Sequence, residues 1–159
     1  MLLATTKLTP CYLARVRQVW ALMTSDTQRV AFAILCAQAI TPLGSIPGWE
    51  RWAQDWLSGA DRSSAAAAAA IISAAVSDIA TALTYAAAAA FHIAYATETA
   101  DAYATESYVS FIADARDHGA RTAARAVAHS IRAIAVLNDR DLAAIAEQAM
   151  TYKEGKGGL

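Results

Sequence analysis

The sequence predicts an all-α protein, a compact bundle of about six to eight antiparallel helices with a close-packed, Ala-rich central hairpin. Alanine supplies 42 of the 159 residues, and it is the best helix former because it loses no side-chain entropy in a helix. Apolar residues recur at helical spacing, and no stretch alternates apolar and polar residues as a half-buried strand does. Helix start and stop residues also separate the helical segments.

The first two predicted helices fill the N-terminal quarter of the chain. One runs from Thr9, a candidate N-cap with Pro10 at the first helical position, to Met23. The next begins after Thr24-Ser25-Asp26. It ends at Thr41-Pro42, because the residue before a proline is disfavoured in helical geometry.

A short third helix is predicted over residues 49–57, followed by Gly59 in a left-handed C-cap. Trp49, Trp52 and Trp56 form one stripe on this helix. Two interpretations stay open, because buried tryptophans anchor helices to a core and exposed ones are enriched at binding hot spots.

The Ala-rich region from Ser63 to Asp117 is too long for one globular helix, although it contains no Gly or Pro. We expect breaks within residues 78–84 and 97–101, and a cleaner stop at Gly119. A further helix should run to about Leu137, and a last one, capped by Asn138-Asp139, from Arg140 to about Tyr152. We expect residues 1–153 to form a single helical domain and residues 154–159 to be a disordered tail.

Composition and charge argue against several classes of partner. The net charge is −1 and no strong basic excess is present, so a nucleic-acid partner is not expected. Residues 79–97 carry no charge, but they are mostly alanine with few of the large aliphatic residues that favour a membrane span. Cys11 and Cys36 are expected to be buried thiols, and the N-terminus lacks the basic start of a signal peptide, so we expect a cytoplasmic protein.

The sequence carries no motif that predicts catalysis. A nucleophile elbow, a phosphate-binding glycine loop and a His-Glu-x-x-His motif are all missing. We therefore expect a protein that is not an enzyme, with no catalytic residues, no cofactor and no resident metal.

Histidines mark two candidate ligand sites. Tyr85, His92, Tyr95 and Tyr103 lie on roughly one side of the Ala-rich region, where they would form either a buried polar seam or a small-ligand pocket. Asp114 and His118 have the i, i+4 spacing of two metal ligands. The alternative there is a helix C-terminus, where His118 meets the negative end of the dipole and pairs with Asp114.

Charged residues form two candidate patches for binding another protein. The basic one lies along one side of the helix after Gly119, and the acidic one lies on a preceding helix. They would either pair with each other, remain solvated, or dock an oppositely charged partner. The basic patch consists of Arg121, Arg125 and Arg132, and the acidic patch of Glu98, Asp101 and Glu106.

The chain resembles the Ala-rich, all-helical immunity proteins of bacteria. The resemblance rests on Trp56-Leu57-Ser58-Gly59, followed by Ala-rich helices with His92 and the repeated Tyr-Ala pairs at residues 85–86, 95–96 and 103–104. It covers residues 49–137 and brings no catalytic residues with it. It implies a cytoplasmic protein that neutralises a toxin by covering the toxin's surface.

The function predicted from the sequence is therefore a small protein-binding module, similar to an immunity protein or an inhibitor. Its partner would be a toxin or, if the protein is phage-encoded, a component of a host defence system. Two alternatives remain, a structural protein that forms homo-oligomers through its Ala-rich faces, and a helical protein that binds a metal or small ligand through His92 or through Asp114 and His118.

Overall fold

A computed structural model describes residues 20–75, 80–102, 106–133 and 139–152. Within these ranges the chain is helical and contains no strand, which confirms the all-α bundle predicted from the sequence. The helices are α2 (Asp26–Ile40), α3 (Pro47–Ser58), α4 (Ser64–Ala74), α5 (Ala80–Ala102), α6 (Glu106–Ala133) and α7 (Asp139–Met150). Most of the predicted first helix, residues 9–19, and the predicted tail lie outside the described residues.

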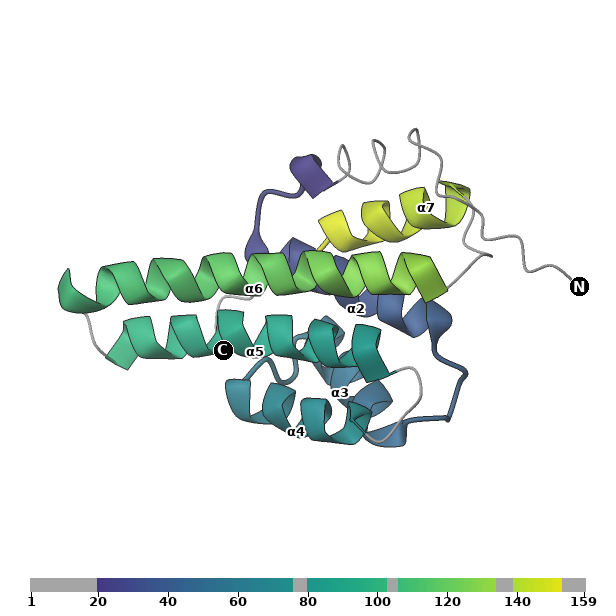
Figure 1. Cartoon of the computed structure of the whole chain (residues 1–159), viewed down its shortest axis with the longest axis horizontal. Coiled ribbons are helices and arrows are strands. Elements are labelled where there is room, and N and C mark those ends of the chain that lie inside the picture. Colours follow the sequence, from purple (N-terminus) through teal and green to yellow (C-terminus); the bar gives the residue numbers. More distant parts are fainter. Residues whose placement is uncertain (1–19, 76–79, 103–105, 134–138, 153–159) are drawn as a thin grey trace, which may run out of the picture.

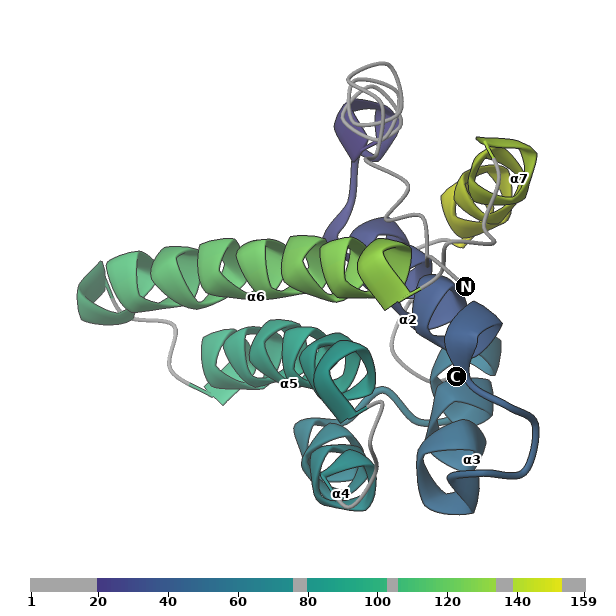
Figure 2. The ribbon, with the colours of Figure 1, turned by 45° about the vertical axis from the view of Figure 1, so that its right-hand side comes forward.

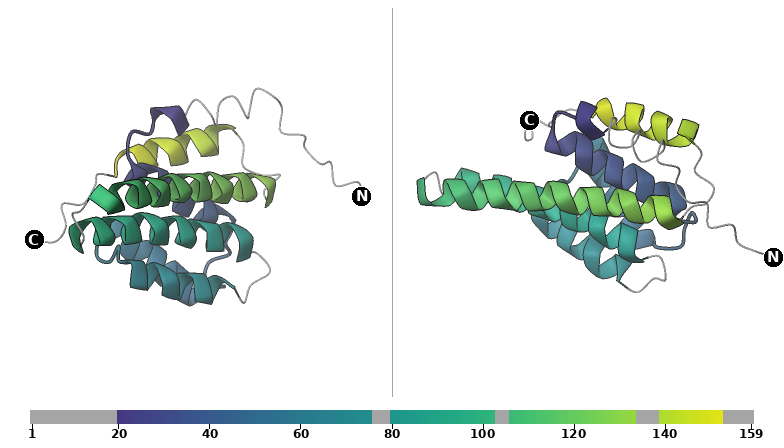
Figure 3. Two further views of the ribbon diagram at one scale, coloured as in Figure 1. Left: turned by 60° about the vertical axis from the view of Figure 1, so that its left-hand side comes forward. Right: turned by 45° about the horizontal axis from the view of Figure 1, so that its top comes forward.

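The helices form two layers of three (Figures 1 and 2). In one layer α5 lies between α4 and α6, and in the other α2 lies between α3 and α7. The layers meet where α2 packs against α5 and α6, and where α3 packs against α4. Helices α5 and α6 lie side by side for most of their length and make the most extensive contact in the molecule (Figure 3).

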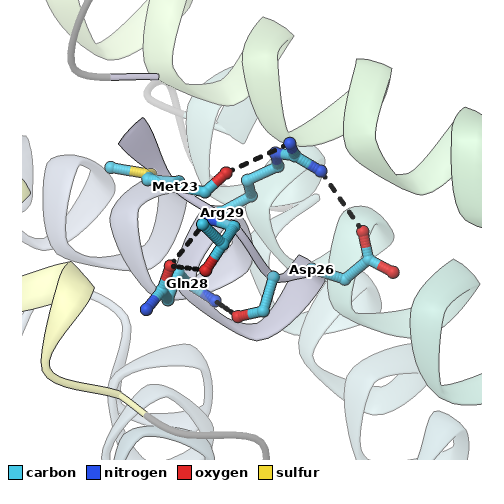
Figure 4. Close-up of polar contacts among 6 residues, drawn as sticks. Met23, Asp26, Gln28 and Arg29 are labelled. Atoms are coloured by element: carbon cyan, nitrogen blue, oxygen red, sulfur yellow. Dashed lines mark hydrogen bonds and ion pairs between the residues drawn. The ribbon is translucent and has the colours of Figure 1, made fainter. Parts of the chain in front are cut away.

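Helix α2 forms the centre of the fold. Five successive residues, 30–34, are fully buried together with Cys36 and Ala37, as expected for a helix that is apolar on all sides. Its start is fixed by Ser25, whose hydroxyl accepts a hydrogen bond from the Gln28 amide. Figure 4 shows how Arg29 then connects this turn to the preceding segment, by donating to the Met23 carbonyl and pairing with Asp26.

Helix α3 carries the tryptophan stripe, and the structure decides between its two interpretations. Trp49, Trp52 and Trp56 are no more than 5% exposed, so they anchor the core and are not a surface hot spot. The indole nitrogen of Trp49 donates to the Leu83 carbonyl at 3.0 Å, which ties α3 to α5. Gly59 ends the helix with φ of 82°, as the sequence predicts.

The Ala-rich helices α4 and α5 bury small side chains. Ser63 caps α4 by accepting from the Ala66 amide, and Ala67, Ala70 and Ala74 face the interior. Helix α5 buries Ala86, Ala87, Ala89, Ala90 and Ala96. These short side chains let neighbouring backbones approach closely, so the contact is made by shape rather than by bulk.

Three predicted helix boundaries in this region are wrong. Helix α4 already ends at Ala74 and α5 begins at Ala80, so the first break precedes most of residues 78–84. Helix α5 continues through residues 97–101 to Ala102, because the Thr97 hydroxyl bonds back to the Ile93 carbonyl and does not cap a new helix.

The predicted stop at Gly119 is the third error, since α6 runs through this residue without interruption. A Cβ atom placed on Gly119 would lie 2.7 Å from Cδ1 and 3.0 Å from Cγ1 of Ile93 on α5. The missing side chain at Gly119 therefore leaves room for Ile93 where α5 and α6 meet, and this glycine does not end a helix. Among the described residues, no helix is long and apolar enough to cross a membrane.

Candidate functional site

The structure brings together two histidines that the sequence analysis assigned to different sites. His92 of α5 and His118 of α6 have ring centres 4.5 Å apart, with the rings nearly perpendicular. They meet beside Gly119, where a Cβ atom would also lie within 3.4 Å of the His92 Cβ. The same close approach that requires glycine therefore places the two imidazoles in contact.

The histidine contact joins two rows of side chains into one surface, which we call the α5–α6 surface. Tyr85, His92 and Tyr95 are spaced seven and three residues apart on α5, so they share one side of that helix. His118, Arg121 and Arg125 share one side of α6 for the same reason, and all three are exposed. The α5–α6 surface thus consists of Tyr85, His92, Tyr95, His118, Arg121 and Arg125.

The described members of the tyrosine row do not form a fully buried seam. Tyr95 is 44% exposed and stacks on Phe91 at 5.8 Å between ring centres, whereas Tyr85 is half-buried against the core. His92 is also half-buried, and its ring meets the Phe91 ring edge-on at 5.5 Å. Tyr103, the fourth predicted member, lies outside the described residues.

Two residues of the basic patch, Arg121 and Arg125, are exposed. Arg121 pairs with Asp117 at 3.0 Å, and both side chains are about two-thirds exposed. Arg125 is exposed and makes no ion pair with any described residue. The side chain of Arg132 is outside the described part of the chain.

Glu98 has a different role from the one expected for the acidic patch. Its carboxylate accepts hydrogen bonds from the Ser64 amide at 3.0 Å and from the Ser64 hydroxyl at 2.5 Å. It therefore stabilises the positive N-terminal end of α4, which is where a carboxylate is most favourable. Glu98 thus contacts the start of α4 and not the arginines, while the side chains of Asp101 and Glu106 are not described.

The environment of His92 favours its neutral form. Burial lowers the pKa of His92 below its ordinary value, and the neighbouring His118 lowers it further. The sequence alternative that placed His118 at a helix C-terminus is wrong, because α6 continues to Ala133. Its imidazole lies in mid-helix, exposed to solvent and against His92.

A concave region of about 280 Å³ is lined by residues of α2, α5 and α6, together with Trp56 at the end of α3 and Arg62. Its charged lining residues mostly serve the fold. Asp26 pairs with Arg29, Glu98 caps α4, and the Arg62 guanidinium lies over the Trp56 ring at 4.6 Å while its Nε donates to the Trp56 carbonyl. We therefore regard this cleft as a less favourable site than the α5–α6 surface.

Other chemistry-bearing groups do not assemble into a site. Among the described residues, no cluster of three or more His, Cys, Asp or Glu side chains is placed to hold a metal ion. Asp114 and His118 share a side of α6 but are not joined by a third such residue. Cys36 is free and fully buried, and burial raises the pKa of its thiol, so it is an inert core residue.

Comparisons of the chain with protein-family models, with curated proteins and with solved structures gave no match. Its function must therefore be inferred from the chemistry of its own surface.

The sequence does contain a signal for the histidine pair. His92 and His118 are equidistant from residue 105, and α5 ends at Ala102 while α6 begins at Glu106. In an antiparallel pair of helices, residues equidistant from the turn lie opposite each other. The predicted break at 97–101, centred on residue 99, would instead place His92 opposite residue 106, which is twelve residues or about three turns of helix from His118.

Proposed function

We propose that this protein is a small, non-enzymatic binding module that recognises another protein through the α5–α6 surface and neutralises that partner by covering part of it. The supporting observation is the composition of this surface. Tyr95 is 44% exposed on α5, three residues from His92, whose ring contacts His118, and Arg121 and Arg125 are exposed on α6. Tyrosine and arginine are the residues that most often dominate the energy of a protein interface.

Little of the charged part of this surface holds the fold together. The Arg121–Asp117 pair joins two residues of the same helix and is open to solvent, so it contributes less than about 1 kcal/mol to stability. An incoming partner can replace it at small cost. Arg121 and Arg125 are thus available to set the rate and specificity of association.

The scaffold is suited to binding because it is already ordered. Helices α5 and α6 pack closely through Gly119 and alanines, so the side chains of the surface are held on rigid elements. A preorganised surface loses less conformational entropy on binding than a flexible one. Occlusion by such a surface is how an immunity protein or an inhibitor would act, and we extend the proposal to both a toxin and a host defence component as partners. We also retain the cytoplasm as its predicted location.

The experiment is site-specific photo-crosslinking in the native host. A photo-reactive amino acid at position 95 should capture one protein, and the same amino acid at position 72, exposed on α4, should not. Arg121→Glu or Arg125→Glu should weaken that capture at least tenfold, whereas Arg51→Glu, a matched charge reversal on α3, should leave it unchanged. Equal capture from positions 95 and 72, or capture that survives both reversals on α6, would contradict the proposal.

One observation supports self-association as a second candidate. Ile72 is 73% exposed on α4, a helix without any charged residue, and Ala65 and Ala69 are exposed on the same helix. If this face joins two copies, the molar mass from light scattering should rise with protein concentration, and Ile72→Glu should restore the monomer. A constant monomer mass would exclude this candidate.

A further inference from the structure

We propose that His92 and His118 form a two-histidine clamp that binds a divalent transition-metal ion across α5 and α6. The inference goes beyond the proposed function and does not depend on it, because metal binding is a property of the isolated chain. It joins two residues that the sequence assigned to separate candidate sites.

The separation of the rings fits chelation of one ion. Two imidazoles that bind the same metal through nitrogens about 2.1 Å away have their ring centres about 4.5–5.3 Å apart, the lower value for an N–metal–N angle of about 90° and the upper for about 109°. The ring centres of His92 and His118 are 4.5 Å apart. In the metal-bound form, one nitrogen of each ring would be directed toward a common point.

The surroundings keep this separation fixed and leave the site open. Gly119 places the two helix backbones close together, and Phe91 packs edge-on against the His92 ring. His118 is exposed, so an ion can reach the pair from solvent. Both ligands lie within long helices and not on loops, which is the arrangement that holds a metal geometry best.

The remaining coordination positions would be filled by water or by a group from a bound partner. This follows because no third His, Cys, Asp or Glu among the described residues completes a cluster with the pair. Such an open site is of the kind that imidazole-preferring ions use, namely Cu²⁺, Ni²⁺ and Zn²⁺. Mg²⁺ and Ca²⁺ prefer oxygen ligands and should not bind here.

The test measures the melting temperature of the untagged full chain with and without metal. Ni²⁺ or Zn²⁺ at about 100 times its dissociation constant should raise Tm by about 5–10 °C, because the ion binds only the folded arrangement. Mg²⁺ at the same concentration should not change Tm. Absence of a shift with Cu²⁺, Ni²⁺ and Zn²⁺ alike would overturn the proposal.

Substitutions at His92 and His118 test whether these two residues bind the metal. His92→Gln and His118→Gln should each abolish the shift, measured against each variant's own metal-free Tm. His129→Gln should retain it, because residue 129 lies eleven positions further along α6, about 16 Å from residue 118. A shift that survives both substitutions at the pair, or that disappears in His129→Gln, would show that the ion binds elsewhere.

A spectroscopic measurement guards against variants that fail to fold. The electron paramagnetic resonance spectrum of Cu²⁺ bound to the wild-type chain should show hyperfine coupling to two imidazole nitrogens. One nitrogen or none would contradict the clamp, even if Tm had risen.

Discussion

Two helix contacts in this bundle are built in opposite ways. Helix α3 packs against its neighbours through large side chains. Trp49, Trp52 and Trp56 are buried, and the Trp49 indole donates a hydrogen bond to the Leu83 carbonyl. Helix α5 packs against α6 through small residues, since Gly119 has no side chain and both helices bury alanines. The first contact is stabilised by large apolar area, the second by the close fit of two backbones.

The difference has a functional consequence. Large buried side chains make their contacts within the core, so they expose little surface that a partner could contact. A close contact between two backbones instead brings the flanking side chains of both helices to the same surface, and this is how His92 and His118 come together. The α5–α6 surface is therefore a product of the small residues beneath it.

The largest expected effect is at Trp49. Trp49→Ala should lower the free energy of unfolding by about 3–5 kcal/mol, because it empties a fully buried site. Urea unfolding followed by circular dichroism would measure this loss. A change below about 1 kcal/mol would show that α3 is not held by bulk.

A finer comparison within the stripe isolates the hydrogen bond. Trp49→Phe removes the bond to Leu83, whereas the buried Trp52 indole nitrogen has no partner among the described residues. Trp49→Phe should therefore be more destabilising than Trp52→Phe by about 1 kcal/mol, as measured in the same unfolding experiment. Equal losses would mean that the Trp49 hydrogen bond contributes nothing.

The next effect tests the second kind of contact. Gly119→Ala should reduce stability by about 1–2 kcal/mol, because the new Cβ would overlap Ile93. In an unconstrained helix the same change would stabilise by about 0.5–1 kcal/mol. Ala124→Gly, on the exposed side of the same helix, is the control and should be destabilising. Glycine is therefore expected to be more stable than alanine at position 119, and alanine more stable than glycine at position 124.

A smaller effect is expected where Glu98 holds the start of α4. Glu98→Gln keeps a hydrogen-bonding oxygen but removes the charge that favours a helix N-terminus, and should lower stability by about 0.5–1 kcal/mol at low salt. Glu147→Gln on α7 is the matched control, since Glu147 is exposed and makes no ion pair within the described chain. If salt does not reduce the difference between the two variants, the effect is not electrostatic.

The smallest effect is a dependence of stability on pH. The pKa of His92 is lower in the folded protein than its ordinary value of 6.5, so the unfolded chain takes up the proton first. The contribution of His92 should be fully present above pH 6.5 and be lost as the pH falls toward the folded-state pKa. His92→Gln should flatten the difference in unfolding free energy between pH 7.5 and 5.5, and His118→Gln should reduce it in part.

The sequence predicts one of the two contacts well and the other poorly. Trp49, Trp52 and Trp56 have the spacing of a helix stripe, and Gly59 is a recognisable C-cap, so α3 is found where it is expected. A glycine such as Gly119 can either end a helix or allow another helix to pack closely against it, and the local sequence does not distinguish these two roles. Only the contact with Ile93 decides between them, and that contact is 26 residues away along the chain.

The site is also difficult to predict from sequence, because it depends on a contact between residues far apart along the chain. Periodicity, which is a local property, predicts Arg121 and Arg125 as members of one basic face. The pairing of His92 with His118 depends on the register of two helices, which is set by where the turn falls. Thr and Asp residues recur within residues 97–106, so caps alone do not locate that turn.

The most direct test of this account is a double-mutant cycle between Gly119 and Ile93, measured as free energies of unfolding. Ile93→Val removes the Cδ1 atom that a Cβ at position 119 would strike, so it should relieve part of the strain in Gly119→Ala. We predict that the double variant is more stable than the sum of the single changes by about 1 kcal/mol. Additivity within about 0.3 kcal/mol, or a Gly119→Ala variant more stable than the wild type, would contradict the claim that a missing side chain brings α5 and α6 together.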